Sequence, residues 1–302
     1  MSALLLLFTC LLLGVLVARR ARPPSGMVHS INWWVINVAL PALVLELIPG
    51  IEVDARLWFP VAAMWVTFFG AWLLFALLGK KLNWPRGRIG ALTLVCGLGN
   101  TSFIGYPMVQ ALHGDAGLAL AVVADQLGSF LLLAVAGVVV ASFYAGKAPQ
   151  PRAIARRVLV FPPFLALIAG IVIACLGGWP AWSGVEPVLK SIGGTLTPLA
   201  LFSVGLQLRF HLGRQQLSAL SIGLGWKLAL APLLVWLLGR MTQTEGLPLT
   251  VSVLESAMAP MISAAIMADE YKLEPALTNS VLGIGIVLSL FTVPLANTLL
   301  IR

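Results

Sequence analysis

The sequence GLGNTSFIGYP at residues 97–107 interrupts one of the long apolar stretches of the chain. Glycine is flexible, and proline lacks an amide donor and clashes with the preceding helical turn, so neither residue suits a helix interior. The sequence therefore predicts a helix over 89–112 that is broken near its centre. The predicted break residues are Gly97, Gly99, Gly105 and Pro107.

A second stretch, ESAMAPMIS at residues 255–263, predicts another broken helix over 247–268. Pro260 removes a backbone donor and would clash with the carbonyl of Ser256, so the freed backbone groups need other partners. Either break alone could be an ordinary proline kink. Two breaks in matching positions indicate a transport site, because interrupted helices line the binding sites of many secondary transporters.

The composition of the chain indicates a membrane protein. Of 302 residues, 60% are hydrophobic and 10% are charged, more apolar surface than a soluble protein of this size can hide from water. The net charge of +8 could suggest a nucleic-acid partner, but the basic residues are scattered in short connections. We therefore expect the apolar surface of the protein to contact the lipid bilayer. We expect no nucleic-acid partner.

Ten apolar stretches are long enough to cross about 30 Å of hydrocarbon as helices. They predict an all-α integral membrane protein with spans at 2–18, 31–49, 58–79, 89–112, 116–143, 159–178, 187–208, 216–239, 247–268 and 275–300.

The distribution of basic residues predicts the orientation. Arg19, Arg20 and Arg22 follow the first apolar stretch instead of preceding it, which favours a membrane helix over a cleaved signal peptide. With both termini outside a plasma (bacterial inner) membrane, most basic residues fall on the cytoplasmic side, as the positive-inside rule requires. The cytoplasmic set is Arg19, Arg20, Arg22, Lys80, Lys81, Arg86, Arg88, Lys147, Arg152, Arg156, Arg157, Arg209, Arg214 and Lys272, against Arg56, Lys190, Arg240 and Arg302 outside.

The two halves of the chain resemble each other weakly. ALPAL at 39–43 has a counterpart in LTPLA at 196–200, and Asp115-Ala116 has one in Glu274-Pro275 at nearly the same separation. Five helices is an odd number, so a second copy must be inverted in the membrane. We predict two inverted repeats, residues 1–157 with helices one to five and residues 158–302 with helices six to ten.

The motif NTSFIGYP at 100–107, continuing to His113-Gly114-Asp115, resembles the fourth-helix motif of the auxin efflux carrier family. That family includes plant auxin exporters and bacterial permeases proposed to carry malate or malonate; the short connection between helices five and six is typical of bacterial members. The resemblance implies a crossed-helix fold similar to NhaA and the bile-acid symporters. In it, helices one, two, six and seven would form a scaffold, and helices three to five and eight to ten a moving transport unit. It also implies that Asn100 and Pro260 lie at the crossover and line the substrate site, and it allows a homodimer.

Four polar residues fall at similar depths near the middle of the membrane when helices rise 1.5 Å per residue. They are Asn100, Lys227, Asp125 and Glu255. Buried charges usually face a cavity or each other and mark substrate or ion paths. We predict a small anionic substrate bound by Asn100, Thr101, Ser102, Pro260, Met261, Ser263 and Lys227. Asp125 and Glu255 are the predicted sites for a coupling ion, either Na⁺ or H⁺.

Structural interpretations of these residues stay open. Lys227 and Glu255 could form only an ion pair, and the polar face Asp125-Gln126-x-x-Ser129 could be contact between helices. The main functional prediction is a carrier of small organic anions, and the alternative is a Na⁺- or H⁺-coupled transporter of the same fold. An enzyme is not expected, because no catalytic motif such as Gly-x-Ser-x-Gly occurs, and neither is a metal site or a cofactor beyond the coupling ion. A channel fits crossed breaks less well. The substrate and the direction of transport are not predicted.

Overall fold

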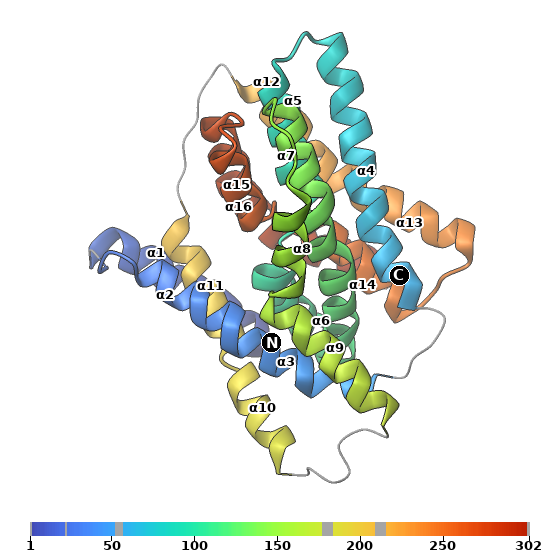
Figure 1. Ribbon diagram of the computed structural model, residues 1–302. Coiled ribbons are helices and arrows are strands. Elements are labelled where there is room, and N and C mark those ends of the chain that lie inside the picture. Colours follow the sequence, from blue (N-terminus) through green and yellow to red (C-terminus); the bar gives the residue numbers. More distant parts are fainter. Residues whose placement is uncertain (1, 22, 52–56, 177–183, 209–215, 301–302) are drawn as a thin grey trace. The chain divides into compact units, whose positions relative to one another are not determined.

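The computed structural model describes residues 2–21, 23–51, 57–176, 184–208 and 216–300 (Figure 1). All regular elements in these ranges are helices, and no strand occurs among them. Parts of three predicted connections, 52–54, 177–183 and 209–214, lie outside the described residues, as do Arg22, Arg56, Arg209, Arg214 and Arg302 of the orientation prediction.

Six helical segments in the described residues are long and apolar enough to cross a membrane. They are Met27–Gly50, Trp58–Lys81, Thr101–Tyr144, Val185–Gln207, Leu217–Thr242 and Pro275–Leu300. Helix α4 (Trp58–Lys81) buries Phe68 and Phe75 completely, while Leu73 and Leu77 on its other side are more than half exposed. A helix that is apolar on both its packed and its outer face suits an apolar surrounding. The protein is therefore an all-helical, multi-pass membrane protein; the count of ten spans stays a prediction.

Contacts divide the chain into two compact units, each of which uses both halves of the sequence. Unit 1 comprises Met1–Asp54, Ser102–Val122 and Ala155–Leu208, and unit 2 comprises Ala55–Thr101, Val123–Ile154 and Arg209–Arg302. Residues 102–122, from predicted helices four and five, are thus packed with segments of predicted helices one, two, six and seven. The predicted scaffold and transport unit are defined by which helices move during transport, whereas the two units here are defined by contacts. The division into scaffold and transport unit therefore stays a prediction.

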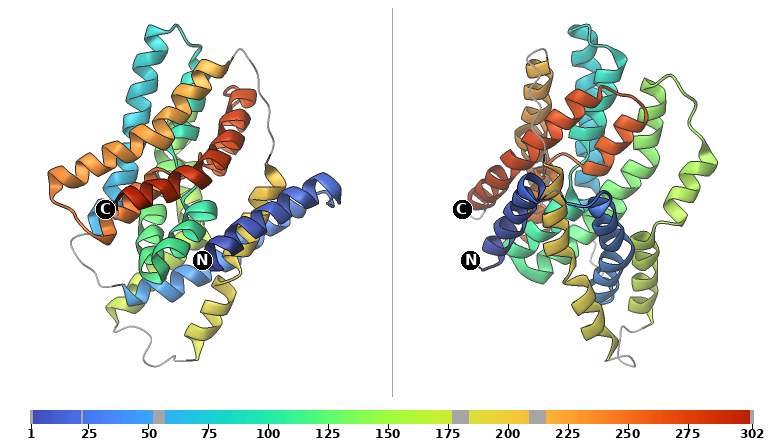
Figure 2. Two further views of the ribbon diagram at one scale, coloured as in Figure 1. Left: turned by 180° about the vertical axis from the view of Figure 1, so that it is seen from behind. Right: turned by 90° about the vertical axis from the view of Figure 1, so that its left-hand side faces the viewer.

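Unit 1 is built on a close pair of helices, α1 and α11, which lie alongside each other (Figure 2). Gly14 of α1 and Gly205 of α11 meet where the two backbones touch, and a methyl group on Gly205 would come within 2.2 Å of the carbonyl oxygen of Leu11. The elements wholly described in this unit are α1 (Ser2–Arg20), α2 (Met27–Trp34), η1 (Val35–Ala39), α3 (Leu40–Leu47), η2 (Ile48–Gly50), α9 (Pro162–Cys175), α10 (Val185–Gly193) and α11 (Leu196–Gln207).

Helix α6 (Tyr106–Val123) belongs to unit 1 for nearly all its length and bends sharply at Gly114, where φ is 66° and ψ −161°. This bend falls at the predicted connection between helices four and five. Just beyond it, Asp115 lies 3.7 Å from the Nζ atom of Lys190 on α10, and Lys190 lies 3.9 Å from Glu46 on α3. Charge contacts therefore join α6 to the two other helices.

Unit 2 has an extended apolar core that includes Phe59, Phe68 and Phe75 of α4. Its elements are α4, α5 (Arg86–Gly97), η5 (Ala124–Phe130), η6 (Leu132–Gly137), α7 (Val138–Tyr144), α12 (Leu217–Gly225), η8 (Trp226–Leu230), α13 (Ala231–Thr242), α14 (Leu247–Ser256), α15 (Ile262–Glu270) and α16 (Pro275–Leu300). Two short elements, η4 (Thr101–Gly105) and α8 (Pro151–Leu159), each contain one of the points where the chain passes between the units.

Candidate functional site

Two breaks between helical segments meet inside unit 2. Helix α5 ends at Gly97 and is followed by Leu98 in extended conformation, with φ −107° and ψ 133°. Helix α14 ends at Ser256, and the chain is extended again at Met261 before α15 begins. At the two breaks, the backbone at Gly99 pairs with the backbone at Pro260 in an isolated antiparallel bridge.

Backbone hydrogen bonds satisfy some of the amide and carbonyl groups that the helix breaks leave without helical partners. The amide of Asn100 donates to the carbonyl of Ala259 at 2.8 Å, and the amide of Met261 donates to the carbonyl of Leu98 at 3.2 Å. Unpaired backbone groups are costly away from water, so each break supplies partners for the other. We call the segments 98–101 and 257–261 together the crossover.

Gly99 allows these backbones to come together. A methyl group at this position would lie 3.0 Å from both the carbonyl oxygen of Glu255 and the Nζ atom of Lys227. The carbonyl is backbone and cannot move aside without displacing α14. Glycine therefore suits the close approach of the two backbones at this position.

Lys227 reaches the crossover from η8, a π-helical segment in the middle of an apolar helix. Its side chain is buried, and its Nζ atom donates a hydrogen bond to the carbonyl oxygen of Ser256 at 2.9 Å. Ser256 is the last residue of α14, where carbonyl groups lack helical partners and carry the negative end of the helix dipole. Lys227 thus caps α14, and among the described residues its ammonium group makes no ion-pair contact with Glu255.

Asp125 reaches the crossover from η5, also a π-helical segment. Its Oδ1 atom accepts a hydrogen bond from the hydroxyl of Thr101, two residues after the bridge. Its Oδ2 atom accepts one from the side-chain amide of Gln126 at 2.8 Å. Both carboxylate oxygens therefore have donors, and Asp125 ties its helix to the segment after the break.

Glu255 is in a different situation, although it lies one residue before the carbonyl that Lys227 caps. Its side chain is fully buried, and neither of its carboxylate oxygens accepts a hydrogen bond from any described residue. A buried carboxyl group without donors carries a large desolvation cost as an anion.

The remaining predicted residues surround these contacts. Asn100 and Met261 are buried in the crossover, and Pro260 occupies the bridge itself. Ser263 is half-buried in the first turn of α15. Ser102 is half-buried in η4 and is grouped with unit 1, so unit 2 by itself does not contain it.

Two of the predicted break residues lie within continuous helix. Gly105 ends η4, and Pro107 follows in the first turn of α6, so the chain changes from π-helical to α-helical spacing there. A wider turn leaves room for the proline ring and accommodates the carbonyl group that has lost its donor, so the helix can continue. The interruption itself is confined to the residues after Gly97.

Trp226 is a polar residue of this region that the sequence did not single out. Its indole N–H is buried and has no acceptor among the described residues. It precedes Lys227 in the middle of a predicted span, whereas tryptophans in membrane proteins favour the membrane edges. That unusual position is the signal that could have identified it.

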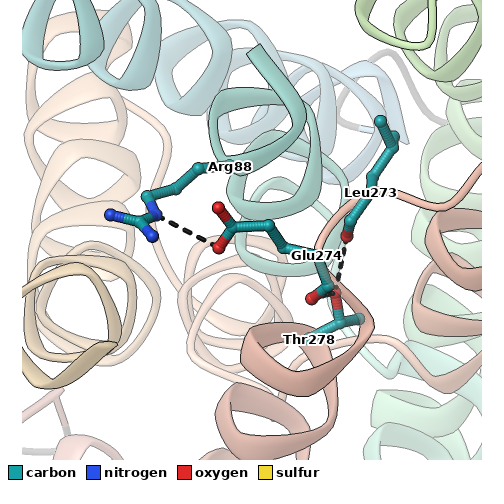
Figure 3. A network of polar contacts seen from close by, with 4 residues as sticks. All are labelled: Arg88, Leu273, Glu274 and Thr278. Atoms are coloured by element: carbon teal, nitrogen blue, oxygen red, sulfur yellow. Dashed lines mark hydrogen bonds and ion pairs between the residues drawn. The ribbon is translucent and has the colours of Figure 1, made fainter. Parts of the chain in front are cut away.

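The far end of α5 is held by an ion pair with the start of α16. The Nε atom of Arg88 lies 3.1 Å from Oε2 of Glu274, and both side chains are about one-fifth exposed (Figure 3). The hydroxyl of Thr278 donates to the carbonyls of Leu273 and Glu274, which fixes the first turn of α16. These contacts position α5, whose other end forms the crossover.

The fold and this buried, polar crossover fit a membrane transport protein, and a family model with that description matches residues 1–296. The chain belongs to this family, the auxin efflux carrier family.

Three relatives extend over nearly the whole chain. It is 26% identical to an uncharacterized transporter of Methanothermobacter thermautotrophicus, over 90% of this chain and 88% of the relative. An uncharacterized transporter of Methanocaldococcus jannaschii is also 26% identical, over 90% of this chain and 89% of its own. The uncharacterized transporter YfdV of Escherichia coli K12 is 25% identical over 97% of this chain and 95% of its own.

Proposed function

We propose that the protein is a secondary transporter that moves small organic anions, such as carboxylates, by elevator-like alternating access. The observation that carries the proposal is the pairing of two helix breaks at Gly99 and Pro260, with charged and amide groups buried around it. Interrupted helices of this kind form the binding sites of many secondary transporters.

The chemistry near α15 supports an anionic substrate. The first amide groups of a helix lack acceptors and carry the positive end of the helix dipole, so they favour negatively charged groups. α15 begins directly after the crossover, with Ser263 in its first turn and Asn100 in the facing break. In the proposed site, the side-chain amide of Asn100 and the hydroxyl of Ser263 donate to the carboxylate beside Pro260 and Met261. Lys227 contributes its positive charge while it caps α14.

The proposed architecture is ten membrane helices in two inverted repeats, residues 1–157 and 158–302. Helices three to five and eight to ten would move against helices one, two, six and seven. Both termini would lie outside a plasma membrane, and two copies could form a homodimer. The crossover inside unit 2 supports this scheme because it joins the matching broken helices.

A second candidate function is coupling of transport to Na⁺ or H⁺ at Glu255 and Asp125. The observation that favours it is the buried Glu255 carboxyl, whose oxygens accept no hydrogen bond from a described residue. A proton or a cation there would remove the cost of the lone negative charge. Asp125 would be the second carboxyl group of this ion site.

The first prediction tests the substrate site by thermal unfolding of the purified protein with small mono- and dicarboxylates, with and without Na⁺, at two pH values. A ligand at one hundred times its Kd stabilises the folded state by about 2.7 kcal/mol. We expect one class of carboxylate to raise the melting temperature, and Asn100→Ala to abolish this shift without lowering the melting temperature of the free protein.

The matched control is Asn279→Ala, an exposed asparagine of α16 that should leave the shift unchanged. A full shift in the Asn100→Ala variant would remove Asn100 from the binding site. Stabilisation by Na⁺ or pH alone, with none by carboxylates, would favour the second candidate function and centre the site on Glu255.

A further inference from the structure

Helix α8 carries three arginines, Arg152, Arg156 and Arg157, and no acidic residue. All three side chains are exposed, and none forms an ion pair with a described residue. Arginines elsewhere in the chain do have partners, for example Arg88 with Glu274 and Arg86 with the carbonyl of Phe143. The basic charge of α8 is therefore uncompensated within the described chain.

Two of the arginines of α8 lie opposite its half-buried apolar residues, and Arg157 lies between the two faces. Arg152 and Arg156 are four residues apart and share one face of the helix, while Ile154 and Val158, also four apart, lie on the opposite face and are half-buried. The next residues, Leu159 and Val160, are 63% and 62% exposed. An exposed basic face beside exposed apolar residues is typical of a helix that lies at a membrane surface.

The position of α8 in the chain favours a membrane surface over a soluble partner. The chain turns out of helical conformation at Phe161, with φ −73° and ψ 114°, and then enters the apolar helix α9. Leu159 and Val160 therefore stand at the junction between the basic helix and an apolar membrane helix. An acidic protein would match the arginines but would leave these two apolar side chains in water.

We propose that α8 binds the anionic phospholipid headgroups of the cytoplasmic leaflet through Arg152, Arg156 and Arg157, with Leu159 and Val160 in the adjoining acyl region. The cytoplasmic location follows from the orientation that the basic residues predict. Each basic residue near an anionic membrane surface strengthens binding to anionic lipid by about fivefold. Removal of two arginines should therefore cause a large loss of anionic-lipid binding.

The test compares lipids that remain bound after mild detergent extraction from bilayers of phosphatidylcholine and phosphatidylglycerol. Mass spectrometry of the intact protein counts the two lipids directly. We expect the natural protein to retain phosphatidylglycerol preferentially, and Arg152→Gln/Arg156→Gln to lose most of that preference. The matched control is Lys80→Gln/Lys81→Gln, which removes the same charge from exposed lysines at the end of α4 on the same predicted side.

Unchanged retention in the α8 variant, or an equal loss in both variants, would overturn the proposal. The substituted side chains are exposed, and a melting curve for each variant confirms that it is folded. Since the readout is lipid composition, its result is independent of whether the protein transports an organic anion.

Discussion

Lys227 is the buried cation of the crossover, and its position assigns it a positioning role. Its Nζ atom donates to the carbonyl oxygen of Ser256, the last residue of α14. Lys227→Met keeps most of the side-chain volume but removes this donor, and an unsatisfied buried carbonyl costs about 1–3 kcal/mol. We expect a lower melting temperature for the variant in detergent, with ligand affinity reduced less than in Asn100→Ala.

The control for this second prediction is Lys80→Met, an exposed lysine in the last turn of α4 that forms no ion pair with a described residue. It should melt close to the natural protein. A Lys227→Met variant of full stability that has lost carboxylate binding would instead make the ammonium group a direct ligand of the substrate.

The sequence could indicate which buried polar residues lie at similar depth, but not which atoms they contact. Helix rise alone placed Lys227 and Glu255 together and suggested an ion pair. In the structure Lys227 contacts the carbonyl of the next residue, Ser256, and Glu255 is left without a donor. The depth of a residue in the membrane does not give the direction of its side chain, which turns by about 100° per residue along a helix. Depth also does not show whether the partner is a side chain or a backbone carbonyl. The contact between Thr101 and Asp125 is equally absent from any periodic pattern.

Prolines in this chain have two different effects on helices. Three of the π-helical segments, η1, η4 and η8, each end two residues before a proline, namely Pro41, Pro107 and Pro232. A proline leaves the carbonyl four residues earlier without a donor, and a wider turn accommodates this within a continuous helix. Pro260 instead lies in a full interruption. A proline in the sequence indicates a local defect, but tertiary packing decides between a wide turn and a break.

The pairing of α1 with α11 carries the third prediction. Gly14 and Gly205 bring the backbones into contact, as small residues do in membrane helix pairs. Gly205→Ala would place its methyl group against the carbonyl of Leu11 and separate the helices, so we expect a loss of about 1–3 kcal/mol. Thermal unfolding in detergent measures this as a lower melting temperature.

Gly225 offers the matched control for this helix contact. It lies at the end of α12, and nothing lies within 4 Å of a methyl group added there. Gly225→Ala should be neutral or raise stability by about 0.5–1 kcal/mol, because alanine loses less conformational freedom in a helix. If the two alanine variants melted alike, close packing of α1 on α11 would not be a source of stability.

At the scale of the whole molecule, each compact unit draws on both halves of the sequence. Unit 2 takes α5 from the first half and α14 and α15 from the second, and these are the elements that meet in the crossover. A single half could therefore not complete the candidate site alone. Weak internal similarity could suggest this arrangement, but the contacts depend on interactions between residues that are far apart in the chain.

The fourth prediction concerns the number of membrane crossings and depends on whether α9 crosses the membrane. Helix α9 has 14 residues and is about 21 Å long, shorter than a hydrocarbon core of roughly 30 Å. We predict that it crosses nonetheless, because the exposed apolar residues Leu159, Val160 and Leu176 extend the apolar segment at both ends. With Val185–Gln207 and Leu217–Thr242, three crossings would then separate residue 148 from residue 243.

Single cysteines decide this count. In a variant with Cys10, Cys96 and Cys175 replaced by serine, we introduce Ala148→Cys or Gln243→Cys, both at exposed positions. A membrane-impermeant maleimide should label residue 243 in intact cells and residue 148 only after permeabilisation, because the basic connection that contains residue 148 is predicted to lie inside. Labelling of both from the same side would mean an even number of crossings, with α9 the first to be reassigned. The reverse pattern would keep the count and invert the protein in the membrane.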